Sequence, residues 1–383
     1  MELVRVMLVK NRKDKMVLVH FGQKHTFSRE GGIEVVVNEL ATRMAAKGHK
    51  VICYDRRSKH VSGATLDIPT DTKGVQIIPV WTIDRKGLAA FTSSLVAALR
   101  ASFSKADVVH IHAEGPAAMA WIPKLFGKRV IVSVHGLDHL RAEKWSGFGR
   151  RYIYFGEKVA VKCADEIIVL SKNLQNYFMD KYNRKTVFIP NGVNKPQSVP
   201  AKMITEKWGL TKDSYVLFLG RIVPEKGLKY LVQAWNGLKT DIKLVIAGGS
   251  SDTKSFMDEL KGMSNDNVIF TGFQQGQILE ELYSNCYLYC LPSDLEGMPL
   301  SLLEAMSYGN CCVVSDIPEC AEVVEDKAVV FKRSDVSSLR TTLQDLLDDE
   351  SRVTDYKNKA ADFICSKYNW DDVVDRTLEL YQG

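Results

Sequence analysis

The chain has 383 residues, of which 45% are hydrophobic and 25% charged, and its formal net charge is +5. This length exceeds one ordinary hydrophobic core and predicts two domains of near-equal size. The small net charge argues against a nucleic-acid partner. No apolar run reaches the length of a membrane span and no signal-peptide pattern is present, so we expect a cytoplasmic protein.

The eight cysteines fit a reducing compartment. Several lie in apolar, strand-like runs, where a free thiol acts as a small hydrophobic side chain: Cys53, Cys286, Cys290, Cys311 and Cys312. The absence of a Cys-X-X-Cys pair argues against a structural zinc site and against a redox motif.

Short runs rich in valine and isoleucine alternate with amphipathic helices along the first half. Two interpretations of segment 1–15 are open: a hairpin with the strand that follows it, or an extra edge strand of the sheet. We expect strands at residues 16–22, 50–54, 75–80, 107–112, 129–135, 166–171 and 186–190. Helices are expected at residues 33–47, 88–103, 116–126 and 149–164, with another that ends at 182. Near-continuous apolar strands between helices are typical of a parallel sheet covered on both faces.

The second half repeats this alternation after a linker at residues 194–200, which has two prolines and no hydrophobic pattern. Its strands are expected at residues 215–219, 243–247, 268–271, 288–291, 312–315 and 328–331. The predicted fold is therefore α/β, with two doubly wound, Rossmann-like domains facing each other across a cleft. They would comprise residues 1–193 and 194–365. Ligands of such folds bind outside the carboxyl ends of the strands.

The most informative run is residues 293–306, which contains Glu296 and Glu304. It indicates a loop that becomes a helix, since Pro299 suits the first helical position and Gly297 permits close approach of a ligand. The N–H groups at a helix start attract an anion. This combination suits a ligand with both phosphate and hydroxyl groups, such as a sugar nucleotide. On spacing alone, two such glutamates are more often solvated surface residues.

Two other segments suit phosphate. Gly31 and Gly32 open a helix after the loop that follows the first strand, without the Gly-X-Gly-X-X-Gly pattern of dinucleotide sites. Arg221 and Lys226 share the loop after the strand at 215–219, where an arginine fork and a lysine charge can hold a diphosphate. A Gly-Gly turn by itself is usually only structural.

Histidines mark two strands of the first half. His135 and Asp138 follow the strand at 129–135, at the sheet edge where sites of α/β folds lie, although a lone strand-end histidine is more often structural. His110 and His112 share one strand face and suggest a metal pair. No third ligand is evident, so no metal site is predicted.

A basic and aromatic stretch lies between Trp121 and Lys162. It contains nine basic residues against three acidic ones, interleaved with aromatic residues. This mixture suits an anionic membrane surface or a lipid-pyrophosphate acceptor, and equally a solvated face above core aromatics.

Together these segments resemble the retaining family-4 glycosyltransferases of the GT-B fold. The matching pieces follow the family's order along nearly the whole chain: residues 31–34, 133–136, 189–193, 220–221 with 226–227, 271–273 and 296–304. Residues 135–145 are similar to the bacterial exopolysaccharide subgroup that includes rhamnosyltransferases.

The resemblance implies a role for each matched residue. Arg221 and Lys226 would hold the donor diphosphate, which would come close to Gly32. Glu304 would bind the ribose hydroxyls, and Glu296 a hydroxyl of the transferred sugar. Backbone N–H groups of Gly297, Met298 and Leu300 would contact the sugar and the phosphate. His135 would lie beside the reacting sugar, and Asp138 would be a polar helper.

The resemblance also implies the reaction. A hexose or deoxyhexose would move from a UDP- or dTDP-linked donor to a polyprenyl-pyrophosphate-linked or oligosaccharide acceptor in surface polysaccharide synthesis, at the cytoplasmic face of the membrane. The first domain would take the acceptor, and the helix within residues 366–383 would cross back to it.

Since the chain has no Asp-X-Asp, cations and helix ends rather than a metal are expected to neutralise the leaving group, and no cofactor is expected. Two alternatives stay open. One is a sugar-nucleotide epimerase or phosphorylase on the same fold, and the other a non-catalytic module that binds a sugar nucleotide or a partner.

Overall fold

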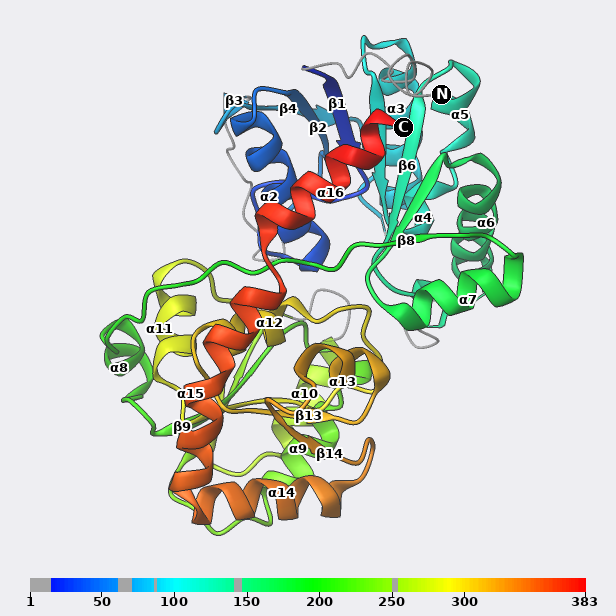
Figure 1. Cartoon of the computed structure of the whole chain (residues 1–383). Helices are drawn as coiled ribbons and strands as arrows, with labels where there is room; N and C mark the ends of the chain where they lie inside the picture. Colours follow the sequence, from blue (N-terminus) through cyan, green and yellow to red (C-terminus); the bar gives the residue numbers. More distant parts are fainter. Residues whose placement is uncertain (1–14, 61–70, 86–87, 141–146, 250–253) are drawn as a thin grey trace, which may run out of the picture.

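The computed structural model of the chain describes residues 15–60, 71–85, 88–140, 147–249 and 254–383. They form two α/β domains, one above the other in Figure 1. The predicted strand or hairpin in segment 1–14 lies outside the described residues.

The first domain is built on an eight-stranded sheet in the order β3-β4-β2-β1-β5-β6-β7-β8. The strands are β1 (Val17–Phe21), β2 (Lys50–Arg56), β3 (Asp71–Thr72), β4 (Val75–Val80), β5 (Val108–His112), β6 (Arg129–Val134), β7 (Glu166–Val169) and β8 (Val187–Phe188). All pairs are parallel except β3–β4. β3 was not expected, because two residues carry no alternating pattern.

Helices cover both faces of this sheet: α2 (Gly32–Ala46), α3 (Leu88–Phe103), α4 (Glu114–Ala117), α5 (Trp121–Leu125), the 3-10 turn η1 (Asp138–Leu140), α6 (Gly147–Cys163) and α7 (Lys172–Tyr182). The single helix expected at 116–126 is wrong, because the structure has α4 and α5 there. Pro123 has no N–H to donate to the Met119 carbonyl oxygen, and the N–H of Ile122 takes that place at 3.1 Å.

The second domain is built on a fully parallel six-stranded sheet in the order β11-β10-β9-β12-β13-β14. Its strands are β9 (Tyr215–Leu219), β10 (Lys243–Ala247), β11 (Val268–Gly272), β12 (Leu288–Leu291), β13 (Cys312–Ser315) and β14 (Val329–Phe331). Its helices are α8 (Met203–Trp208), the 3-10 turn η2 (Pro224–Lys226), α9 (Leu228–Trp235), α10 (Lys254–Met263), α11 (Gln277–Asn285), α12 (Leu300–Ser307), α13 (Pro318–Val324), α14 (Val336–Asp348) and α15 (Glu350–Lys367).

The chain passes between the domains twice. Residues 189–202 lead from β8 to α8, and α15 is followed by α16 (Trp370–Gln382), which packs beside α2 on the first domain (Figure 1). A parallel bridge between Val193 and Asn369 places the two passages side by side.

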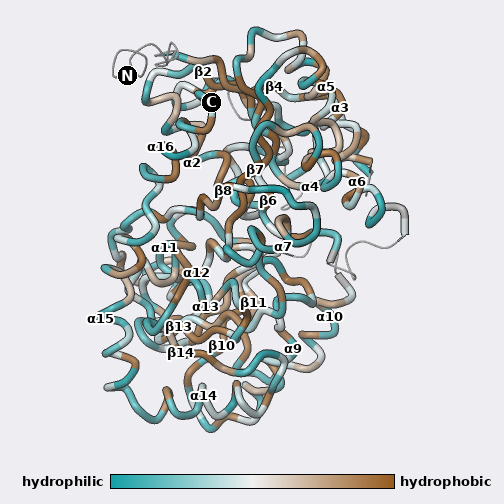
Figure 2. The backbone as a smooth tube through the Cα atoms, turned by 45° about the vertical axis from the view of Figure 1, so that its right-hand side comes forward, coloured by the Kyte–Doolittle hydropathy of each residue, from teal (hydrophilic) through white to brown (hydrophobic). Residues whose placement is uncertain are grey.

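Each domain has its own hydrophobic core, and Figure 2 shows the hydrophobic segments gathered inside both. All eight cysteines are free, and the five expected in apolar strand-like runs are buried. Among the described helices, none combines the length and the apolar character needed to cross a membrane.

Candidate functional site between the domains

Loops that follow strands of the two sheets meet between the domains. His135 follows β6 of the first sheet, and Gly297 follows β12 of the second. A Cβ atom on Gly297 would lie 1.7 Å from the carbonyl oxygen of His135 and 3.2 Å from the Cα of Gly136. Only glycine fits this position, so the domains approach each other backbone to backbone here.

Lys226 and Glu296 form the centre of the site. Lys226 Nζ lies 2.5 Å from Glu296 Oε1, and both side chains are largely buried. The Ser293 hydroxyl donates to the same oxygen at 2.6 Å. Gly227 adopts a φ of +68°, and a Cβ there would lie 1.9 Å from the Pro292 carbonyl oxygen. This tight turn brings the loop that carries Lys226 against the loop that carries Glu296.

Arg221 lies in the same loop as Lys226 and is half-buried. The N–H of Gly220 donates to the carbonyl of Ala247 at 3.0 Å, which ties the loop to the end of β10. A Cβ on Gly220 would lie 3.9 Å from Lys226 Cε. The two predicted cations therefore belong to one compact loop at the end of β9.

Glu304 contacts the first domain from α12. Its Oε1 accepts a hydrogen bond from Arg29 Nη2, and its Oε2 accepts one from the Tyr283 hydroxyl at 3.1 Å. The charge of the Glu304 carboxylate raises the pKa of Arg29. Arg29 was not selected from the sequence, where its only signal is its place two residues before Gly31.

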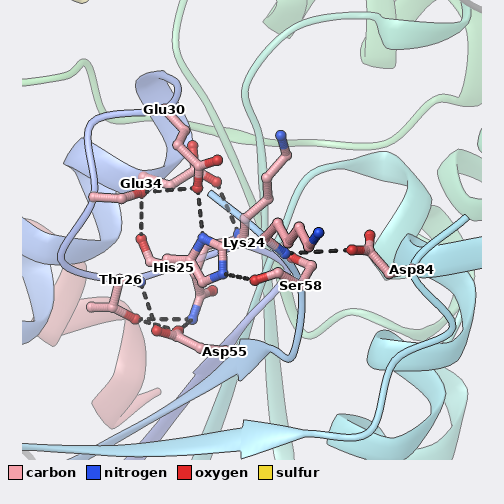
Figure 3. A network of polar contacts seen from close by, with 11 residues as sticks. Lys24, His25, Thr26, Glu30, Glu34, Asp55, Ser58 and Asp84 are labelled. Carbon is pink, nitrogen blue, oxygen red and sulfur yellow. Dashed lines mark hydrogen bonds and ion pairs between the residues drawn. The ribbon is translucent and has the colours of Figure 1, made fainter. Parts of the chain in front are cut away.

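A polar network holds the loop that carries Arg29 (Figure 3). His25 Nδ1 and Glu30 Oε2 are 2.6 Å apart, and both side chains are buried. The N–H of Lys24 donates to Glu34 Oε1 at 2.9 Å, and that of Thr26 donates to Asp55 Oδ2 at 2.8 Å. The loop is thereby fixed to α2 and β2 beside the interdomain contact.

The predicted donor residues Gly32, Met298 and Leu300 all lie where the domains touch. A Cβ on Gly32 would lie 3.4 Å from Leu300 Cδ1. The carbonyl oxygen of Met298 accepts a hydrogen bond from Asn191 Nδ2 at 3.3 Å. Pro299 is not the first helical residue as expected. It precedes α12 with a ψ of 102°, and the helix begins at Leu300.

His135 is half-buried beside this contact, with its Nε2 3.3 Å from His112 Nδ1. Burial lowers the pKa of His135 to about 4, although the Asp138 carboxylate opposes the effect. The imidazole is therefore neutral near pH 7. Asp138 begins η1, where its N–H donates to Glu114 Oε2 at 2.8 Å.

His110 and His112 do have a third histidine nearby. His20 on β1 is in register with His110, and its Nδ1 lies 3.2 Å from His112 Nε2. His110 already contacts the Tyr381 hydroxyl and the Ser133 hydroxyl, at 2.6 Å and 2.7 Å. His20 could not be selected from the sequence, because the pairing of β1 with β5 is not local.

Two family models match the chain in succession. Glycosyltransferase Family 4 matches residues 30–195, and Glycosyl transferases group 1 matches residues 202–363. The chain is a family-4-like glycosyltransferase of the GT-B fold. The first matched range ends at residue 195 and the second begins at residue 202, both within the segment that leads from the first domain to the second.

Relatives of this glycosyltransferase cover much of its length. It is 24% identical over 385 residues to an uncharacterized glycosyltransferase of Methanocaldococcus jannaschii, covering 92% of this chain and 94% of the relative. It is 28% identical over 237 residues to the N,N'-diacetylbacillosaminyl-diphospho-undecaprenol alpha-1,3-N-acetylgalactosaminyltransferase of Campylobacter jejuni, covering 58% and 62%.

Solved structures confirm the predicted fold class. The sucrose-phosphate synthase of Thermosynechococcus elongatus has a TM-score of 0.80 at 19% identity, covering 96% of this chain and 98% of that one. Anabaena HepE in complex with UDP-glucose has a TM-score of 0.78 at 15% identity, covering 95% and 98%. At these identities the likeness concerns the fold.

Proposed function

We propose that this glycosyltransferase moves a hexose or deoxyhexose, with retention of configuration, from a UDP- or dTDP-linked donor to a lipid-linked or oligosaccharide acceptor in surface polysaccharide synthesis. The observation that carries the proposal is a pair of ionic contacts beside the interface between the domains. Lys226 pairs with Glu296 next to Gly297, whose backbone meets that of His135, and Glu304 pairs with Arg29 of the first domain. A polar, largely buried site at facing strand ends is where GT-B-type domains would hold a donor.

Donor binding would exchange existing ion pairs for contacts to the donor. Lys226 would turn from Glu296 to the diphosphate and leave the Glu296 carboxylate to accept from a sugar hydroxyl. Glu304 would likewise exchange Arg29 for the ribose hydroxyls. Each charge-assisted hydrogen bond to the diphosphate contributes about 1.5–3 kcal/mol.

The departing nucleoside diphosphate gains negative charge as the glycosidic bond breaks. Arg221 and Lys226 would stabilise this charge, helped by the N–H groups at the start of α12, which have no partner within the helix. These groups supply the role that a metal ion plays in other transferases, so we propose a metal-independent reaction. A neutral His135 can donate a hydrogen bond to the reacting sugar without adding charge.

Two relatives support the substrate classes. The Campylobacter jejuni enzyme is, by its name, a transferase that acts on a diphospho-undecaprenol-linked sugar. Anabaena HepE binds UDP-glucose. An isoprenoid-linked acceptor would require this enzyme to work at a membrane surface.

The first domain presents a surface of suitable chemistry, the α3–α5–α6 face. Its most exposed apolar side chains are Phe103 and Leu125, at 75% and 76%. The rings of Phe103 and Phe126 are 4.8 Å apart, which joins α3 to the end of α5. Other exposed apolar residues on or beside these helices are Trp81, Leu88, Phe91, Leu99, Trp121 and Phe155.

The same helices carry exposed basic residues, of which Lys124 is paired with Asp165. Exposed basic residues on these helices are Arg100, Lys124, Arg150, Arg151, Lys158 and Lys162, and the acid Glu157 within α6 is fully buried. Apolar side chains among lysines and arginines bind anionic lipid surfaces. We therefore propose peripheral membrane association through the α3–α5–α6 face.

The test is turnover by the purified protein with a panel of UDP- and dTDP-linked sugars, read as release of nucleoside diphosphate with a polyprenyl-linked acceptor. The proposal expects acceptor-dependent release that Glu296→Ala and Arg221→Ala strongly reduce. Full activity of both variants would refute the site. Release of a free altered sugar without acceptor would instead indicate an epimerase.

A further inference from the structure

A second polar cluster is buried inside the first domain, away from the proposed donor residues. It joins Glu114 of α4, His139 of η1 and Glu157 of α6. Both glutamates are 0% exposed, and His139 is 6% exposed. A Cβ on Gly156 would lie 1.9 Å from the Glu114 carbonyl oxygen. Glycine at 156 thus lets α6 approach α4 closely enough to bring the two carboxylates together.

Three atoms with lone pairs converge in this cluster, and one of them, Glu157 Oε2, also accepts a hydrogen bond from the Tyr177 hydroxyl at 3.1 Å. His139 Nδ1 lies 3.5 Å from Glu114 Oε1 and 3.3 Å from Glu157 Oε2. Within the part of the chain that the structure describes, Glu114 Oε1 and His139 Nδ1 make no hydrogen bond. An N–H on His139 would meet both oxygens beyond the usual 2.7–3.2 Å range. The ligand atoms of the three residues all lie within 4.8 Å of one another.

This spacing matches a metal ion better than a hydrogen bond. Nitrogen and oxygen ligands lie about 2.0–2.2 Å from Zn²⁺, so neighbouring ligands of a tetrahedral site are about 3.3–3.5 Å apart. We propose that Glu114, His139 and Glu157 bind a divalent cation of the zinc class. Mixed imidazole and carboxylate ligands suit Zn²⁺, with a fourth position for water.

Charge balance agrees with this proposal. Lys181 Nζ lies 3.0 Å from Glu157 Oε1 and offsets one carboxylate. Glu114 has no lysine or arginine ion partner among the described residues, and an unpaired buried carboxylate is unfavourable. Burial, with the nearby charge of Asp138, raises the pKa of Glu114 well above its usual range. A proton on Glu114 therefore competes with the cation for this carboxyl group.

A cation here would have a positioning role. It would tie η1 to α4 and α6, and η1 carries Asp138, whose N–H already donates to Glu114 Oε2. The short turn beside His135 would then be held to two helices in addition to its own backbone contacts. The site involves none of Arg221, Lys226, Glu296 or Glu304, so it does not depend on how the donor is bound.

The test is the zinc content of the full-length protein, with any histidine tag removed. Zinc is supplied both in the growth medium and during dialysis, because the cluster is buried, and it is then measured by mass spectrometry. Glu114→Gln retains an oxygen acceptor for the Asp138 N–H but removes the charge, and His139→Asn is a second variant. The matched control is His49→Gln, since the His49 ring lies outside the cluster and accepts a hydrogen bond from the Met16 N–H at 3.2 Å.

The proposal expects about one equivalent of zinc in the wild type and in His49→Gln, with at least about a tenfold lower retention in both cluster variants. Added zinc should also raise the Tm of the wild type and leave that of Glu114→Gln unchanged. Circular dichroism confirms that the variants fold. A wild type without retained zinc, or cluster variants that retain as much as the wild type, would overturn the proposal in favour of a shared proton.

Discussion

Lys226 Nζ and Glu296 Oε1 are 2.5 Å apart, although their residues are 70 positions apart in the chain. The pair occupies the point where the loop after β9 meets the loop after β12. The ion pair occupies both groups that the donor would need. The lysine ammonium suits the diphosphate, and the glutamate carboxylate suits a sugar hydroxyl. We therefore expect loss of Lys226 to weaken donor binding as well as the departure of the diphosphate, and loss of the Glu296 charge to act chiefly on the reaction step.

Lys226→Ala should raise the donor KM by about 10- to 100-fold, the equivalent of one charge-assisted hydrogen bond. Glu296→Gln keeps the shape but removes the charge, and it should lower kcat by about 100-fold. Steady-state kinetics with the best donor measures both. Lys229→Ala is the control, because Lys229 pairs with Glu259 at an exposed position. Equal effects of the control and Lys226→Ala would contradict the assigned role.

Gly297→Ala should separate the domains where their backbones meet, because the added Cβ would lie 1.7 Å from the His135 carbonyl oxygen. We expect a larger radius of gyration by small-angle scattering and a loss of most activity. Gly262→Ala is the matched control, since a Cβ there meets no atom within 4 Å. Unchanged scattering and activity in Gly297→Ala would show that this approach is not needed.

Acid should destabilise the fold through buried His20. Burial lowers the pKa of His20 to about 4 from an ordinary value of 6.5. Between these values the unfolded chain binds the proton and the folded chain does not, so stability falls as the pH drops below 6.5. From pH 7 to pH 5 the loss due to His20 is about 2 kcal/mol. Urea unfolding of the wild type and His20→Gln measures it, and an identical pH dependence of the two would contradict the prediction.

Binding to lipid vesicles should require both charge and apolar side chains of the α3–α5–α6 face. Wild type should float with vesicles containing phosphatidylglycerol but not with pure phosphatidylcholine, and high salt should weaken the interaction. The double variant Phe103→Glu, Leu125→Glu should lose most binding. Substituting Val330, an exposed apolar residue on the second domain, by glutamate is the control. Flotation of the double variant at the wild-type level would rule this face out.

The sheet strands were predictable because their patterns are local. The strands expected at 75–80, 215–219, 243–247, 288–291 and 312–315 agree with β4, β9, β10, β12 and β13. Four of them, β9, β10, β12 and β13, are short apolar runs that are largely buried on both faces, and such burial requires a continuous apolar run. Likewise, the loops with Arg221 and His135 were selected because they directly follow such strands, and Glu296 was selected because its run indicates a loop that becomes a helix.

Contacts between distant segments could not be predicted in this way. Arg29 and Glu304 are 275 residues apart, and only the packing of the two domains brings them together. The same is true of His20, which reaches His112 through the pairing of β1 with β5. Glu114 begins a four-residue helix whose pattern is too short to reveal that its carboxylate is buried.

The most direct test of the donor site is thermal unfolding of the purified protein with UDP and dTDP, without added magnesium. A ligand that binds only the folded state at about 100 times its Kd stabilises it by about 2.7 kcal/mol. We expect a clear rise in Tm with one of these nucleotides, which Lys226→Ala and Glu304→Ala reduce to about half or less. A rise that appears only with magnesium, or one that both variants retain in full, would contradict this expectation.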